Sequence, residues 1–141
     1  MVSDAQKALI KSSWAGVDLN AAGVAFLNQM EQKAHDVYAV FKVGGGATSN
    51  PKAAALGLKV MTFVDEAVKG IDDMGAVGGK LDELAQRHTK YGAKKAHFPV
   101  AGPCFLDALA EVCGGRFSAD ARAAWSDFYD VIAQHLSAPL A

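Results

Sequence analysis

The 141-residue sequence has few cysteines and prolines and lacks the long apolar run, about twenty residues, that a membrane helix needs. Its two cysteines, Cys104 and Cys113, are nine positions apart on one expected helix. That spacing separates them by about 13 Å along the helix axis, so we expect reduced, buried thiols instead of a disulfide. The segment from Met1 to Lys7 has neither the basic nor the apolar region of a secretory signal, which predicts a cytoplasmic protein.

The sequence also has no large excess of charge of one sign. Fourteen basic and fifteen acidic residues leave a formal net charge of -1. No strong field therefore attracts the chain to nucleic acid or to an anionic membrane, and we expect neither as a partner.

The common catalytic motifs are absent as well. The sequence contains no G-x-S-x-G, no glycine-rich phosphate loop before a helix, no H-E-x-x-H and no CxxC pair. The four histidines stand far apart, so a zinc site would need distant residues to converge. A site that uses one histidine has no such requirement. The histidines are His35, His88, His97 and His135.

Helical periodicity dominates what remains. Apolar residues recur at spacings of three and four, and no strand pattern competes with them. The length suits one domain over residues 1–141, with six clear helices and one or two short ones in crossed packing around one core. The apolar faces are expected over Ile10 to Val17, Val24 to Met30, Leu56 to Ala67, Leu81 to Tyr91, Ala101 to Val112 and Trp125 to Leu136.

Several residues mark where these helices begin and where the chain turns. Ser3 with Gln6 forms a capping box, Asn50 precedes Pro51, and Ser118 is an N-cap. A second helix is expected from about residue 21 to 33, and a short apolar stretch covers 37–41. The glycine-rich segments 44–49 and 70–79 are expected to be a flexible connection and a corner.

One histidine shares an apolar face with two leucines. Leu81, Leu84 and His88 recur at helical spacing, and the preceding expected helix carries a second apolar stripe that includes Leu56 and Val60. Two such walls with one imidazole suit haem, whose iron is commonly held by one proximal histidine. A lone histidine on an apolar face is more often a core residue, however, and spacing alone does not overturn that interpretation.

Six motifs in order identify a resemblance to a known family. The sequence resembles the globins over nearly its whole length, and especially the small intracellular haemoglobins of annelid worms. The motifs are Trp14 in the first expected helix, Phe41 after Ala39-Val40, the stripe from Ala55 to Val60, the segment Leu84 to His88, the segment His97 to Gly102, and Ala124-Trp125.

The resemblance implies an all-α globin fold of about seven to eight helices around haem b (iron protoporphyrin IX). His88 would be the proximal iron ligand, with Leu84 in the same segment. Phe41 would stack on the haem, Val60 would press on the bound gas, and Phe98 would line the proximal wall. Lys59 or Arg87 would pair with a haem propionate; the alternative for both is a solvated helix charge.

Two positions depart from the family pattern. Leu56 stands where globins usually have a histidine that donates a hydrogen bond to oxygen, so the distal side of the pocket is expected to be apolar. Some worm globins share this leucine. Globins often have a proline at the position that follows His35 in this sequence, and here that position is Asp36. The residue of the second helix that faces the ligand is Phe26 or Leu27, and the sequence does not distinguish them.

The implied function is reversible oxygen binding for transport or storage, by a protein that is not an enzyme. Carbon monoxide and nitric oxide are further expected ligands, and the chain is expected to be a monomer or weak homo-oligomer. One alternative is haem-dependent peroxidase or nitric oxide dioxygenase activity, although Leu56 provides no acid–base group for peroxide cleavage. Another is a helical partner-binding module without haem, in which the apolar stripes are only core.

Overall fold

The protein is all-helical in its computed structural model, which describes residues 2–90 and 92–140. Within these ranges there are seven α-helices, two 3-10 turns and no strand, as the sequence predicted. Tyr91, expected on the face of His88, lies outside the described residues. The helices are α1 (Asp4–Trp14), α2 (Leu19–Lys33), α3 (His35–Val40), α4 (Pro51–Lys69), α5 (Met74–Lys90), α6 (His97–Cys113) and α7 (Ala119–Ser137), and the 3-10 turns are Ala47–Ser49 and Gly114–Arg116.

Side-chain caps fix where the longer helices begin. Ser3 and Gln6 form the predicted capping box of α1, and Asn50 and Ser118 accept hydrogen bonds from the first turns of α4 and α7. The helix α2 begins earlier than expected because Asp18 accepts from the backbone N–H groups of its first turn. Capping residues thus account for three predicted helix starts and for one that the sequence reading placed too late.

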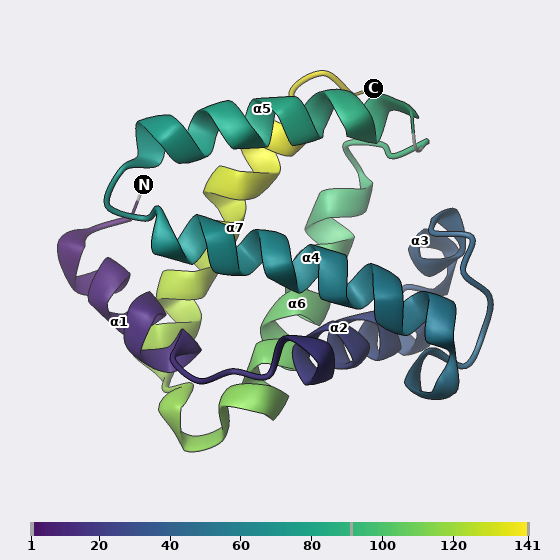
Figure 1. The fold of residues 1–141 in the computed structure, drawn as a ribbon, viewed down its shortest axis with the longest axis horizontal. Coiled ribbons are helices and arrows are strands. Elements are labelled where there is room, and N and C mark those ends of the chain that lie inside the picture. The colour runs from purple at the N-terminus through teal and green to yellow at the C-terminus, as the bar shows by residue number, and fades with distance from the viewer. Residues whose placement is uncertain (1, 91, 141) are drawn as a thin grey trace.

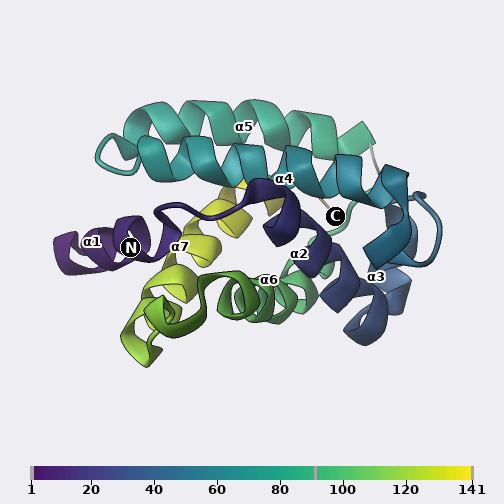
Figure 2. The same ribbon diagram turned by 60° about the horizontal axis from the view of Figure 1, so that its bottom comes forward.

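The helices cross one another in two layers. Figures 1 and 2 show α4 and α5 on one side of the molecule, with α6 and α7 running across beneath them. The helix α2 packs against both α4 and α6, while α1 and α5 pack against α7. This arrangement is the crossed packing expected from helices of unequal length. No described helix has the length and apolar character needed to span a membrane.

The crossing of α2 and α4 depends on two glycines. A β-carbon added at Gly23 would lie 2.4 Å from the backbone carbon of Gly57, and one added at Gly57 would lie 2.6 Å from that of Gly23. Only glycine permits helix backbones to approach this closely. The contact fixes the position of α4 over α2.

The core beneath is rich in aromatic rings. Trp14 and Trp125 lie with their centroids 5.4 Å apart, and Phe128 packs edge-on against Trp125. The indole N–H of Trp125 donates to the buried Ser13 hydroxyl at 2.8 Å, and that hydroxyl donates to the Leu9 carbonyl, so the polar groups in this core are satisfied. The cysteines Cys104 and Cys113 are buried free thiols, and burial raises the pKa of each.

Part of the predicted glycine-rich corner is helical, so the expectation for residues 70–79 was wrong from Met74 onward. Asp73 accepts a hydrogen bond from the backbone N–H of Ala76 and so helps to start α5. Val77, one turn before Leu81, is buried and continues the apolar face toward the start of the helix. Burial of this face outweighs the weak helix propensity of the glycines, and only the segment 70–73 turns.

Two smaller expectations also change. The helix α1 ends at Trp14, so Val17 lies beyond it in the turn to α2. The segment 44–49, expected to be a flexible connection, ends in a 3-10 turn, and its backbone is tied to side chains of α2 and α3.

Candidate functional site

His88 lies half-buried on α5, with its ring oriented by its own helix. Its Nδ1 atom is 2.9 Å from the carbonyl oxygen of Leu84, one turn earlier. A carbonyl only accepts hydrogen bonds, so Nδ1 carries the proton of the neutral ring. The ring lone pair is then on Nε2, the nitrogen at the far side of the imidazole. This tautomer is the one that a metal ligand bonding through Nε2 requires.

Phe98 lies beside His88 at the start of α6. The two ring centroids are 6.3 Å apart and the planes are tilted by 45°. The hydroxyl of Tyr129, on α7, donates to the Phe98 carbonyl at 2.7 Å, which anchors this first turn of α6. Residues from α5, α6 and α7 thus converge behind the imidazole.

The helix α4 presents two different apolar faces. One face is fully buried and packs toward α2; it includes Gly57 and Met61. The other face is only half-buried. It carries Leu56 and Val60, which the sequence placed in a second apolar stripe, and also Phe63.

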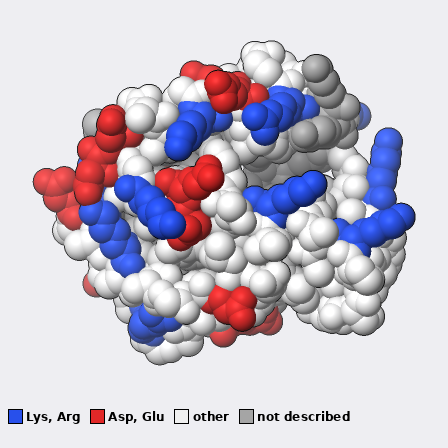
Figure 3. All heavy atoms as spheres, viewed as in Figure 1, with Lys and Arg blue, Asp and Glu red and all other residues white. Residues whose placement is uncertain are grey.

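A depression in the protein surface lies between α4 and α5. In the described part of the chain, α4 packs closely on α2 and α5 packs closely on α7, but α4 and α5 do not pack closely on each other. Figure 3 shows the surface hollowed between these two helices, with both signs of charge spread over the same side of the molecule. An apolar, flat molecule would cover side chains that the protein itself leaves half-exposed.

Phe41, immediately after α3, is held by a short network. Its ring stands edge-on to Tyr38 at 6.2 Å, and the Tyr38 hydroxyl donates to the Gly44 carbonyl at 2.6 Å. The Glu31 carboxylate accepts from the backbone N–H groups of Gly46 and Ala47 at 2.7 and 2.9 Å. These two backbone bonds lower the pKa of Glu31. The loop that follows Phe41 is therefore fastened to α2 and α3.

The structure also separates the two candidates on α2. Phe26 packs edge-on against Phe105 of α6, with the centroids 6.0 Å apart. Leu27 is fully buried one turn after Gly23, on the side that faces α4. The nearby polar residue Gln29 donates to Glu111 of α6 at 3.2 Å and so is directed away from α4. Leu27 therefore lies on the side of α2 that packs on α4, and Phe26 on the side that packs on α6.

The remaining sequence candidates lie at the surface. Lys59 on α4 and Arg87 on α5 are exposed helix charges. His35 is exposed at the start of α3, His97 accepts a hydrogen bond from the Lys94 backbone, and His135 lies 3.0 Å from Asp82. The described residues contain no cluster of three or more histidine, cysteine, aspartate or glutamate side chains that could hold a metal ion. A metal group held by one protein ligand fits this donor set.

Comparison with known proteins agrees with this geometry. The model of the Globin family matches residues 24–136. The structure is similar to the deoxy form of haemoglobin from Dasyatis akajei, with a TM-score of 0.85 and 23% sequence identity over 100% of this chain and 99% of that one. At 23% identity the structural similarity shows a shared fold only. The match to the family model is the stronger evidence of relationship.

Proposed function

This chain belongs to the globin family, and on that premise we propose that it binds haem b (iron protoporphyrin IX) through His88 and binds oxygen reversibly, for transport or storage. The observation that carries the proposal is the His88 imidazole, oriented by the Leu84 carbonyl at 2.9 Å beside a half-buried apolar wall. We take the whole chain, residues 1–141, as a single globin domain.

Haem supplies a ferrous iron with an open coordination position at which small gases bind. The protein supplies the proximal ligand. Because Nδ1 donates to Leu84, Nε2 of His88 presents its lone pair, and the hydrogen bond increases the basicity of that nitrogen. Fixing the tautomer and the ring orientation in advance reduces the ordering that ligation requires.

Most of the binding free energy for the porphyrin would come from burial of apolar surface. The apolar residues proposed to contact it come from four separate helices or their ends, and each of these is half-buried in the structure. Lys59 is an exposed cation on α4, where it would pair with a propionate at the haem edge. The apolar contacts are Phe41, Leu56, Val60, Leu84 and Phe98.

The distal side is proposed to be apolar. Leu56 and Val60 share a face of α4, Leu27 would lie beside it in the haem-bound protein, and Gln29 donates to Glu111 of α6. None of the leucine or valine side chains donates a hydrogen bond or moves a proton. They would restrict access and exclude water, and would admit oxygen, carbon monoxide and nitric oxide alike.

This apolar wall favours a binding protein over an enzyme. Peroxidase chemistry is assisted by a positioned acid–base group near the bound peroxide, and leucine at position 56 provides none. The leucine also supports the resemblance to the small haemoglobins of annelid worms. We propose a monomer or weak homo-oligomer whose ligands are small gases.

The absorption spectrum of the purified protein tests the proposal. We expect a Soret band that is lost in His88→Ala while far-UV circular dichroism shows that the helices remain. His35→Ala, at an exposed position on α3, is the matched control and should keep the band. A colourless, folded wild-type protein would remove the haem proposal and leave the alternative of a helical partner-binding module.

A further inference from the structure

The loop that follows Phe41 has three glycines in a row, at positions 44–46. Gly44 and Gly46 have φ angles of 89° and 72°, in the left-handed region. Glycine loses more conformational freedom on folding than any other residue, and it has no side chain with which to fasten itself. This loop therefore keeps one conformation only where groups outside the glycines hold its backbone.

The left-handed turn begins immediately after Phe41. Lys42 has a φ angle of 57°, the only positive value among the non-glycine residues that the structure describes. That conformation is unfavourable for a residue with a β-carbon and persists only where the surroundings enforce it. The backbone next to Phe41 thus depends on how the loop is held.

Two uncharged side chains hold carbonyl groups of the loop. The Tyr38 hydroxyl, on α3, donates to the Gly44 carbonyl at 2.6 Å. The Asn50 amide, at the N-cap of α4, donates to the carbonyls of Val43 and Gly45 at 2.8 and 3.0 Å. These bonds tie the first half of the loop to α3 and to the start of α4.

Glu31, near the end of α2, holds the second half of the loop and is the charged member of the set. One carboxylate oxygen accepts from the Gly46 N–H at 2.7 Å and the other from the Ala47 N–H at 2.9 Å. Gly46 is the N-cap of the 3-10 turn and has no side chain to cap it, so Glu31 supplies the acceptor from another helix.

The two bonds to Glu31 are charge-assisted. Those from Ala47 and then Gly46 lower the pKa of Glu31, so the group is ionised at neutral pH. A hydrogen bond to an ionised acceptor is stronger than one between neutral groups. Ala47 is also buried, where the 3-10 turn packs against α2 and α4. Glu31 is therefore the strongest of the three attachments of this loop.

We propose that Glu31 is a positioning residue for haem, which acts by fixing Phe41 and does not itself touch the porphyrin. Tyr38 connects the two, because it donates to the loop and also packs edge-on against Phe41 at 6.2 Å. The second connection is the backbone at Lys42. This inference rests on the proposed haem function and adds to it a residue that determines how firmly haem is held.

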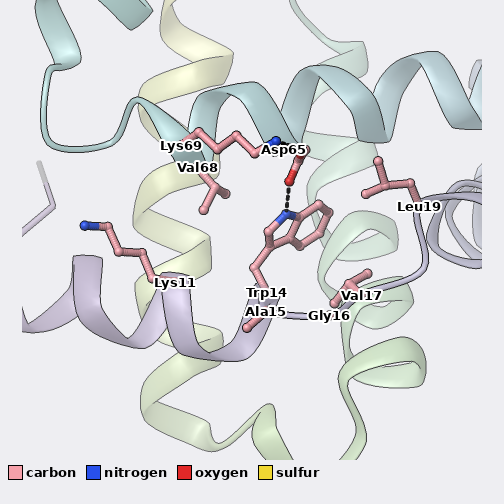
Figure 4. A pocket seen from close by; sticks show the side chains of 9 residues that line it. All are labelled: Lys11, Trp14, Ala15, Gly16, Val17, Leu19, Asp65, Val68 and Lys69. Carbon is pink, nitrogen blue, oxygen red and sulfur yellow. Dashed lines mark hydrogen bonds and ion pairs between the residues drawn. The ribbon is translucent and has the colours of Figure 1, made fainter.

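A second carboxylate in the protein has a different role and provides a comparison. Asp65 of α4 accepts from the Trp14 indole N–H and pairs with Lys69, both at 2.9 Å. Figure 4 shows this group in a groove of about 480 Å³ between the end of α1 and α4. Its partners belong to α1 and α4, not to the loop after Phe41. Removal of its charge should weaken the fold without acting through Phe41.

The test measures how fast haem leaves the protein. Transfer of haem to an excess of a haem-scavenging protein is followed through the Soret band. Glu31→Gln keeps one oxygen acceptor, but it loses the charge and turns an NH₂ donor toward a loop N–H. We expect haem to leave about fivefold faster than from wild type. Glu66→Gln, at an exposed position on α4, is the matched control and should release haem at the wild-type rate.

A double-variant cycle separates positioning from a general loss of stability. Phe41→Leu keeps an apolar side chain but removes the ring. In that background Glu31→Gln should change the rate of haem loss by about twofold or less, because the ring through which Glu31 acts is gone. Asp65→Asn should change the rate by the same factor with and without Phe41→Leu.

Amide hydrogen exchange, measured by NMR on the haem-bound protein, reports on the attachment itself. The Gly46 and Ala47 amides should exchange slowly in wild type and faster in Glu31→Gln. Equal exchange in the two proteins, or an acceleration of haem loss that is the same in both Phe41 backgrounds, would overturn the positioning role and leave the haem proposal standing. A wild-type protein without a Soret band would overturn both.

Discussion

The backbones of Gly23 and Gly57 meet at the crossing of α2 and α4, with no room for a side chain on either. Alanine at Gly57 must push the helices apart, because its β-carbon would lie 2.6 Å from backbone and backbone does not rotate away. We expect Gly57→Ala to lower the free energy of unfolding by about 1–3 kcal/mol. Urea denaturation of the haem-free protein measures this.

Gly79→Ala is a control for which the free energy of unfolding is expected to change in the opposite direction. Gly79 is exposed within α5 and has open space around its α-carbon. Alanine there should raise stability by about 0.5–1 kcal/mol, because it favours the helix without meeting a neighbour. Equal effects of the two substitutions would show that α2 and α4 do not meet as described.

The acid stability of the fold should depend in part on Asp107. This carboxylate of α6 accepts from Lys33 of α2 and Arg122 of α7, both at 2.8 Å. The hydrogen bonds from these two cations lower the pKa of Asp107 from its ordinary value of 3.8. A lowered folded-state pKa contributes stability above the unfolded value, and this contribution disappears as the pH falls through the folded value.

We therefore expect Asp107→Asn to be less stable than wild type near pH 7, and the difference to shrink as the pH falls below about 4. Because the group is about one-third exposed, the effect should be small. Thermal melting between pH 7 and pH 3 measures it. Asp130→Asn, at an exposed position on α7, is the comparison and should show a weaker pH dependence.

His88→Gly should bind haem weakly without unfolding the chain. Most of the proposed haem contact is apolar, so the cavity remains while the iron loses its protein ligand. Added imidazole should restore the Soret band in part, because it replaces the missing ring. Haem retention equal to wild type without imidazole would mean that His88 is not the proximal ligand.

The helices and the candidate site differ in how far sequence predicts them. Capping residues and apolar spacing are local, so the start of α4 at Asn50 and the exposed or buried sides of α7 could be predicted. The first turns of α5 could not be predicted, because three glycines there indicate a turn, although the buried Val77 among them continues the apolar face of the helix. Its stability depends on packing against α7.

The choice between Phe26 and Leu27 shows the same limit. Both are apolar, adjacent and buried, and only the crossing at Gly23 determines which one is turned toward α4. The hydrogen bond from His88 to Leu84 is likewise a property of the folded helix. The cytoplasmic location and the oligomeric state stay predictions from sequence.

The deoxy ferrous protein should contain five-coordinate, high-spin iron. A sixth protein ligand would have to come from the distal side, where Leu56 has no donor atom. Two of the other histidines are bonded elsewhere, His97 to the Lys94 backbone and His135 to Asp82, and His35 is exposed at the start of α3. A six-coordinate, low-spin spectrum at neutral pH would show that another side chain reaches the iron.

The last prediction concerns oxygen release and Leu56. Oxygen gains partial negative charge as it binds ferrous haem, and a hydrogen bond to it contributes about 1–3 kcal/mol. Without a donor at position 56, oxygen should dissociate roughly tenfold to a hundredfold faster than from a pocket with a distal histidine. Carbon monoxide is less polar, so its affinity should change little. Leu56→His should slow oxygen release in stopped-flow measurements and lower the ratio of carbon monoxide to oxygen affinity.

Leu58→His is the matched control, since Leu58 lies on the same helix with its side chain exposed. Gln29 donates to Glu111, so we do not expect it to supply the missing donor in wild type. An unchanged oxygen dissociation rate in Leu56→His would mean that residue 56 does not face the ligand, because a histidine within reach of bound oxygen must donate to it or repel it.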